Sequence, residues 1–199
     1  MTQLVDLVLM RAKVKGHPGN ASEIARVLRL SKQNEYKQMV FTYSQDANLL
    51  YGYFYLDKPS EIGAIDESEF VGSADPLVEE FEISRVVFVN PLDGFSYLET
   101  PNNRYTVEMD PEAGWREELF AWYDKEHLPG LACVPGCIRA TRCINLDHSP
   151  YSFAFYDLLS PQVLGCEAWL KVRHTPWSDR VRPHFTNTRR TMFCFVSSN

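Results

Sequence analysis

The sequence lacks a hydrophobic run long enough to cross a membrane. Its N-terminal apolar stretch is interrupted by Arg11, Lys13 and Lys15, and no segment reaches the ~20 apolar residues that a spanning helix needs. The same stretch has neither the positive start nor the small-residue cleavage site of a signal peptide. These absences predict a soluble, cytoplasmic protein that has no membrane partner.

Basic clusters and phosphate-binding loops are also missing. The chain has 20 Lys and Arg against 26 Asp and Glu, a formal net charge of −6, which argues against a nucleic-acid partner because such binding needs clustered cations. No glycine-rich phosphate loop, GxSxG elbow or HExxH helix occurs, so nucleotide-dependent, serine-hydrolase and zincin activities have no support. We expect no cofactor.

Cysteine is sparse and odd in number. Of the five cysteines, Cys133 and Cys137 are four apart without a nearby histidine, whereas zinc sites usually pair CxxC-type spacings with a second ligand pair. In a chain without an export signal the cysteines are expected to be thiols. No metal site is predicted.

The composition is that of an ordinary globular protein, since 199 residues with 45% hydrophobic side chains can bury a sizeable core. Alternating and helical hydrophobic patterns follow one another in the order β-α-β-β-α-β. The first pass comprises strands at Leu4–Val14, Lys37–Tyr43, Leu50–Leu56 and Ile83–Val89, a helix at Ala21–Ser31 and a broken surface helix at Ser60–Glu80.

The same order then repeats without detectable identity to the first pass. Asp110-Pro111 is expected to open a helix as an N-cap followed by proline, and Pro129-Gly130 to end it. Ser160-Pro161 opens a second helix by the same device. The remaining predicted elements are strands at Tyr105–Met109, Ile138–Leu146, Tyr151–Leu158 and Thr188–Val196, and a short turn from Thr175 to Arg182.

This repetition predicts an α+β protein made of two tandem ferredoxin-like βαββαβ halves. Residues 1–90 would form a degenerate N-terminal half and residues 91–199 the C-terminal half. Because a lone ferredoxin-like sheet leaves one face bare, we expect the halves to close as a dimeric-α/β-barrel-type unit within one chain. Its interior would hold a small ligand, and the protein would be a monomer or a homodimer.

One motif in the second half carries a family resemblance. The run Trp122–Pro129 has the pattern W-Y-x-x-E-H-x-P, and Val134-Pro135-Gly136 and the strand Arg139–Arg142 follow it. This stretch resembles the EthD-like branch of the dimeric α/β-barrel superfamily, best over Tyr105–Arg142 and less distinctly to Val196. The superfamily includes isomerases, cyclases, decarboxylases, cofactor-independent monooxygenases and haem-degrading enzymes, so the resemblance implies a fold more firmly than a reaction.

The resemblance implies that His127 faces the cavity and serves as an acid or base. Histidine titrates near neutrality, and a position at a helix C-terminus favours its protonated form. Asp124 or Glu126 is a candidate to orient the ring, and Tyr123 a candidate to present a phenol to the substrate. The alternative is a histidine that only caps the helix.

Seven further residues are candidate substrate-binding residues, each with packing or solvation as its alternative. Arg139 and Arg142 are three apart on one strand, so at most one of them faces the interior, where it would bind an anionic group. The aromatic members suit a flat aromatic substrate. The candidates are Trp122, Arg139, Arg142, Tyr151, Phe153, Trp177 and His184.

The sequence therefore favours a cofactor-independent lyase or isomerase acting on a small aromatic or polyketide-like substrate in a barrel cavity. Decarboxylation, dehydration and proton-transfer isomerisation all fit His127 as general acid/base. One alternative is a cofactor-free monooxygenase acting on a phenolic or anthrone-like substrate, which would consume dioxygen. The other is a non-catalytic ligand-binding or assembly protein.

Overall fold

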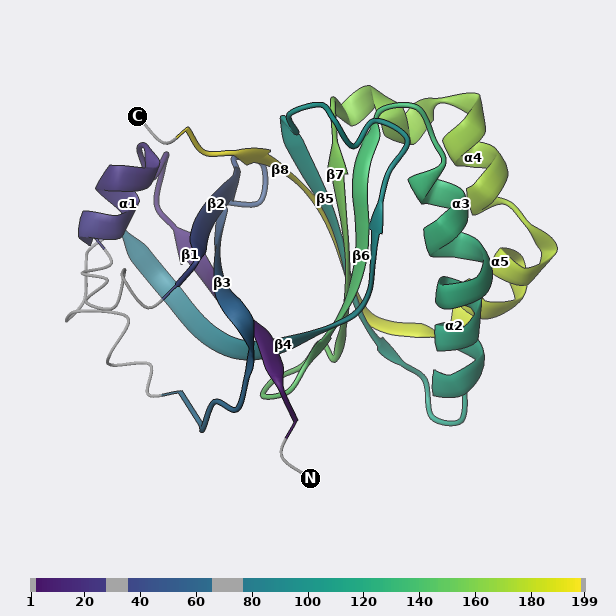
Figure 1. Ribbon diagram of the computed structural model, residues 1–199, viewed down its shortest axis with the longest axis horizontal. Coiled ribbons are helices and arrows are strands. Elements are labelled where there is room, and N and C mark those ends of the chain that lie inside the picture. Colours follow the sequence, from purple (N-terminus) through teal and green to yellow (C-terminus); the bar gives the residue numbers. More distant parts are fainter. Residues whose placement is uncertain (1–2, 28–35, 66–76, 198–199) are drawn as a thin grey trace. The chain divides into compact units, whose positions relative to one another are not determined.

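A computed structural model describes residues 3–27, 36–65 and 77–197. The chain divides into two compact units, unit 1 (Met1–Val87 with Phe193–Asn199) and unit 2 (Phe88–Met192) (Figure 1). The described residues form an α+β fold of eight antiparallel strands and a few helices, typical of ferredoxin-like α/β-barrel proteins. Within these residues no helix is both long and apolar enough to cross a membrane.

Unit 1 contains β1 (Val5–Val14), α1 (Ala21–Val27), β2 (Gln38–Ser44), β3 (Leu49–Ser60) and the first part of β4 (Val78–Asp93). Its strand order is β4-β1-β3-β2. Alternate residues of these strands, among them Met10 and Phe54, form a buried cluster with Ile24 of α1. The period-2 pattern thus gives the sheet one face that packs against a helix.

The second helix predicted for unit 1 is wrong where the structure describes it. Ser60 is the last residue of β3, residues 61–65 form no helix, and β4 already begins at Val78. Residues 66–76 of that predicted helix, like residues 28–31 of the first one, lie outside the described residues. The acidic 77–82 segment extends instead because its backbone pairs with β1.

Unit 2 carries the larger helical layer. Its strands β5 (Asn103–Pro111), β6 (Cys137–Asn145), β7 (Ser152–Leu158) and β8 (Phe185–Phe195) follow the order β8-β5-β7-β6. Its helices are α2 (Arg116–Trp122), the π-helix η3 (Tyr123–His127), α3 (Leu128–Ala132), the 3₁₀ turn η4 (Pro161–Gly165), α4 (Glu167–Arg173), α5 (Pro176–Val181) and the 3₁₀ turn η5 (Arg182–His184).

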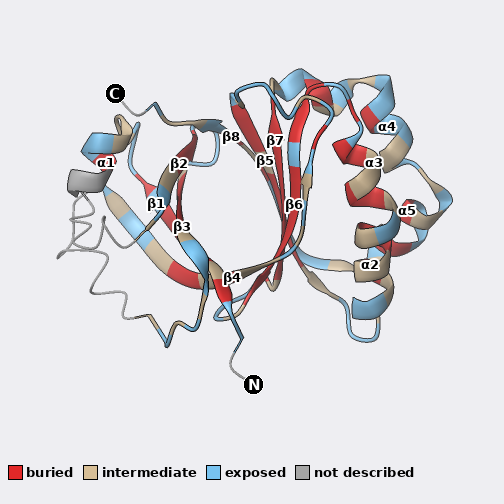
Figure 2. Ribbon diagram, in the orientation of Figure 1, coloured by how far each residue is buried: buried red, intermediate tan, exposed pale blue. Residues whose placement is uncertain are grey.

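The helices of unit 2 lie along one face of its sheet, and the sides that they turn toward the strands are buried (Figures 1 and 2). Trp122, Leu128 and Leu131 from the helices pack with Val107 and Tyr156 from the strands. Strands β4 and β8 run through both units. The predicted boundary at residue 90 and the closing of two tandem halves stay predictions.

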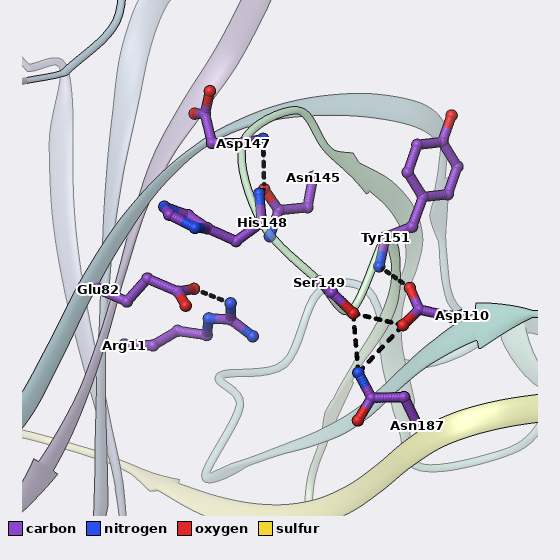
Figure 3. Close-up of polar contacts among 9 residues, drawn as sticks. All are labelled: Arg11, Glu82, Asp110, Asn145, Asp147, His148, Ser149, Tyr151 and Asn187. Atoms are coloured by element: carbon purple, nitrogen blue, oxygen red, sulfur yellow. Dashed lines mark hydrogen bonds and ion pairs between the residues drawn. The ribbon is translucent and has the colours of Figure 1, made fainter.

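The prediction that Asp110-Pro111 opens a helix is wrong. Both residues belong to β5, and α2 begins only at Arg116. The Asp110 carboxylate accepts hydrogen bonds from the Tyr151 backbone N–H at 2.6 Å, from Asn187 at 3.0 Å and from the Ser149 hydroxyl, as Figure 3 shows. Partners distant in sequence have therefore taken the oxygens that would have capped a helix.

The prediction that Pro129-Gly130 ends the helix is also wrong, since the helical path continues to Ala132. Pro129 lies in the first turn of α3, where a missing N–H is tolerated. Gly130 is needed for packing, because a Cβ at this position would lie 2.8 Å from Cγ1 of Val172 in α4. The glycine therefore permits a close approach of α3 and α4.

The predicted helix from Ser160 to Arg173 is interrupted. A 3₁₀ turn follows Pro161, and α4 starts after Cys166, whose sulfur accepts the N–H of Trp169 at 3.4 Å. The short turn expected from Thr175 to Arg182 is present as the helix α5 (Pro176–Val181) followed by η5. There the Thr175 hydroxyl caps the N–H of Ser178 at 3.0 Å.

Candidate functional site

A pocket lies between the sheet and the helices of unit 2. Its cavity volume is about 40 Å³. The lining residues are Tyr105, Val107, Trp122, Tyr123, His127, Leu131, Tyr156, Leu164, Trp169, Arg173, Arg182, Phe185 and Arg190. This pocket lies on the helical face of the sheet of unit 2, and the expected site inside a barrel stays a prediction.

Aromatic rings form the walls of this pocket. The His127 ring stacks on Trp122 with centroids 4.1 Å apart, and Tyr123 meets His127 edge-on at 5.6 Å. Tyr156 meets Trp169 edge-on at 5.3 Å. Such walls present flat apolar surfaces to a ligand and polar atoms at the ring edges.

Three of these rings carry buried polar atoms without a hydrogen-bond partner among the described residues. They are Nε1 of Trp122, Nδ1 of His127 and the hydroxyl of Tyr156. Unpaired buried polar groups are rare in native proteins because each costs free energy. Because three of them meet at one pocket, this pocket is a candidate ligand site.

Burial, together with the smaller effects of the positive charges of Arg182 and Arg173, lowers the pKa of His127 to about 3. The imidazole is therefore neutral at pH 7. The expectation that a helix C-terminus favours the protonated form is contradicted, since His127 lies in the π-helix η3 with α3 continuing beyond it.

The two buried phenols of the pocket remain protonated at pH 7. Burial raises the pKa of Tyr123, against the smaller opposing effect of Arg190. Burial likewise raises the pKa of Tyr156, and Tyr123 adds to that shift. Both hydroxyls are therefore available as hydrogen-bond donors.

The π-helix that carries Tyr123 and His127 is tied to the sheet by Asp124. Its carboxylate accepts hydrogen bonds from Nη2 of Arg142 at 3.0 Å and from Nε at 3.2 Å. The Arg142 guanidinium also lies 4.3 Å from the centre of the Phe120 ring in α2. Asp124 therefore binds Arg142 rather than orienting His127.

The other predicted binding residues do not line the pocket. Arg139 is exposed and pairs with Asp93 at 3.4 Å, while Arg142 is buried against Asp124. Tyr151 precedes β7 and stacks with Phe120, and the ring of Phe153 lies 5.8 Å from that of Phe155.

Trp177 and His184 also belong to other clusters. The Trp177 indole donates to Glu118 at 2.9 Å, which joins α5 to α2. His184 stacks on Trp115 at 3.4 Å and binds Glu112. Of the ten predicted site residues, only Trp122, Tyr123 and His127 line the pocket.

The sequence reasoning missed the residues that the strands and the C-terminal segment bring to this pocket. Tyr105 and Tyr156 alternate with the residues of the opposite sheet face, and that alternation was the available indication. Arg173, Arg182 and Arg190 come from α4, η5 and β8, and no local spacing marks them as neighbours.

No family model and no curated protein matches this chain. Several solved structures share its fold. One is an anthrone oxidase-like protein, with 14% identity and a TM-score of 0.64, covering 98% of this chain and 92% of that one. Another, from Listeria monocytogenes, is a ferredoxin fold protein related to antibiotic biosynthesis monooxygenases, with 9% identity, a TM-score of 0.58 and coverage of 98% and 96%.

A third structure is a heme-degrading enzyme, also from Listeria monocytogenes, with 8% identity, a TM-score of 0.54 and coverage of 94% and 98%. At these identities the likeness establishes the fold alone, a ferredoxin-like α+β fold. The prediction of a lyase or isomerase is contradicted, because the neighbours are named as anthrone oxidase-like, monooxygenase-related and heme-degrading proteins.

Proposed function

We propose that this protein is a cofactor-free monooxygenase that oxidises a phenolic or anthrone-like substrate in the pocket of unit 2. The carrying observation is the convergence of a neutral His127, the unpaired atoms of Trp122 and Tyr156, and cationic side chains on one aromatic-walled pocket. The names of the structural neighbours support the same class of reaction.

The overall reaction converts a ring CH₂ into a carbonyl: CH₂ + O₂ gives C=O + H₂O. Loss of a proton turns the substrate into an electron-rich anion, which reduces dioxygen and forms a C–O bond. The proton returns to the resulting peroxide. Loss of the second C–H proton and cleavage of the O–O bond then leave the carbonyl and release water, so the substrate supplies all the electrons.

His127 is the proposed proton acceptor. A pKa of about 3, caused mainly by burial, makes the free imidazole a weak base. An anion bound beside Arg173 and Arg182 would offset the smaller part of this lowering, which comes from their charges. The protonated hydroxyls of Tyr123 and Tyr156 would donate hydrogen bonds to the substrate oxygen as its negative charge develops.

We also propose that the chain belongs to the EthD-like branch, on the strength of the W-Y-x-x-E-H-x-P motif at Trp122–Pro129. The closing of two tandem halves within one chain is part of this proposal. A homodimer or a monomer fits it, and size-exclusion chromatography with light scattering would test the assembly.

The function is tested by oxygen uptake with protein purified free of metal and haem. With 1,8-dihydroxyanthrone as substrate we expect one O₂ consumed per quinone formed, and a loss of about 10²–10⁴-fold in His127→Ala. Arg139→Gln, away from the pocket, is the matched control. Binding without oxygen uptake would indicate a non-catalytic binding protein, and activity only with added haem would contradict the proposal.

A further inference from the structure

The pocket of unit 2 has an unusual charge distribution for this protein. Its lining includes Arg173, Arg182 and Arg190 but no aspartate or glutamate. The whole chain has 26 acidic and 20 basic side chains. The pocket lining therefore carries a positive charge, whereas the chain as a whole carries a net negative charge.

These arginines differ from those that serve structure. Arg104 binds Asp157 at 2.6 Å, Arg142 binds Asp124 at 3.0 Å, and Arg180 binds Glu118. None of the three pocket arginines forms an ion pair within the described residues. Their charges are thus not offset by the protein's own acidic groups.

The three charges also act on one another. Burial lowers the pKa of Arg182, and the repulsion from Arg173 and Arg190 lowers it further. Like charges brought together by α4, η5 and β8 cost folding free energy, a cost that natural proteins accept mainly at functional sites. A bound anion would offset it.

We infer that the pocket selects an aromatic substrate carrying a negatively charged group, with the anion held by Arg173, Arg182 and Arg190 and the ring placed against Trp122 and Tyr156. This inference rests on the proposed function, whose substrate it specifies. A carboxylate or a phenolate satisfies it. The planar guanidinium groups suit either oxygen anion, and a carboxylate can be bound in a bidentate way.

A neutral imidazole beside these cations fits the same substrate class. Nδ1 of His127 is buried and has no partner among the described side chains, so it can accept a hydrogen bond from a substrate hydroxyl without competing for the anion. A protonated histidine at this place would be a fourth cation. The pocket thus separates a charged region from a neutral polar one.

The test compares 2-naphthoate with its neutral analogue 2-naphthamide by isothermal titration calorimetry under nitrogen. We expect naphthoate to bind about tenfold or more tightly, the effect of one charged contact. In Arg182→Gln the preference should fall toward unity, whereas Arg139→Gln, which removes an exposed charge elsewhere, should keep it. Thermal melting of both variants shows whether the fold is retained.

Equal affinities for the two probes, binding of neither, or an unchanged preference in a folded Arg182→Gln would overturn the inference. If Arg182→Gln fails to fold, Arg190→Gln, at an exposed position, replaces it with the same expected result. The binding test is run without oxygen, so its result is independent of the oxygen-uptake test. A preference for naphthoate in a protein that takes up no oxygen would remove only the proposed function. Oxygen uptake by a protein that shows no such preference would remove only this inference.

Discussion

Single residues at the pocket work against stability. An unpaired polar atom in a protein interior costs about 1–3 kcal/mol, and Trp122, His127 and Tyr156 each contribute one. The surrounding aromatic packing offsets this cost, because rings of this size dominate the burial of apolar area. The same atoms are the ones that a polar aromatic ligand would satisfy.

Tyr156→Phe should separate the effect of this hydroxyl on stability from its effect on ligand binding. Removal of an unsatisfied hydroxyl is expected to leave the free energy of unfolding unchanged or to raise it by up to about 1 kcal/mol. The affinity for a phenolic ligand should fall, because the hydrogen bond in the complex is lost. Urea unfolding and ligand titration measure both quantities; destabilisation with unchanged affinity would show that the hydroxyl is structural.

The low pKa of His127 predicts a pH-dependent stability. The unfolded chain binds a proton at this residue near pH 6.5, whereas the folded protein does so only near pH 3. Between these values the unfolded state binds more protons, so stability rises with pH by at most about 1.4 kcal/mol per unit and is lost as the pH falls from 6.5 toward 3.

Acid unfolding curves of the parent and of His127→Phe measure this contribution. The phenyl ring keeps the stacking on Trp122 and removes the titrating group, so the pH dependence above pH 4 should flatten. Ring-carbon NMR shifts of His127 should meanwhile stay those of a neutral imidazole at pH 5. A titration midpoint near 6.5 in the folded protein would refute the neutral assignment.

At the scale of elements, the π-helix η3 is the feature that positions the site. π-helical turns are frequent at functional sites, and this one lies between α2 and α3 and places Tyr123 and His127 at the pocket. The bond from Arg142 in β6 to Asp124 holds the turn against the sheet. Tyr123 and His127 therefore depend on Asp124 for their position.

The two partners of this bond should differ in the cost of their removal. Asp124→Ala leaves the guanidinium of Arg142 buried and unpaired, with an expected cost of about 3 kcal/mol. Arg142→Met leaves Asp124, whose side chain is 37% exposed, in contact with water, with an expected cost of about 1 kcal/mol. Urea unfolding of both variants measures the two losses of unfolding free energy. Equal losses would show that burying Arg142 without its partner carries no extra cost.

Elements with strong local patterns could be predicted and those set by distant contacts could not. The strands around Val8, Phe54 and Phe155 were predicted correctly because their hydrophobic residues alternate or form continuous apolar runs. The helix expected at Asp110 failed because its carboxylate bonds Tyr151 and Asn187. The π-turn depends on Arg142, a partner 18 residues from Asp124, which no local propensity encodes.

At the scale of the whole molecule, the proposed site belongs to one unit. Every residue lining the pocket lies between Tyr105 and Arg190, within unit 2. Unit 1 has the corresponding strand order, β4-β1-β3-β2, but its sequence has no W-Y-x-x-E-H motif. The sequence could predict the fold class and the helix that carries His127, but the cationic side of the pocket required three distant segments in one structure.

The origin of the oxygen in the product tests the central claim most directly. The metal-free protein would be incubated with 1,8-dihydroxyanthrone under ¹⁸O₂, and the quinone analysed by mass spectrometry. The account predicts that the new carbonyl carries one labelled atom, and that labelled quinone forms about 10²–10⁴-fold more slowly in His127→Ala but at the parent rate in Arg139→Gln. If the parent protein forms an unlabelled quinone, or forms no quinone, the account of a cofactor-free monooxygenase is contradicted.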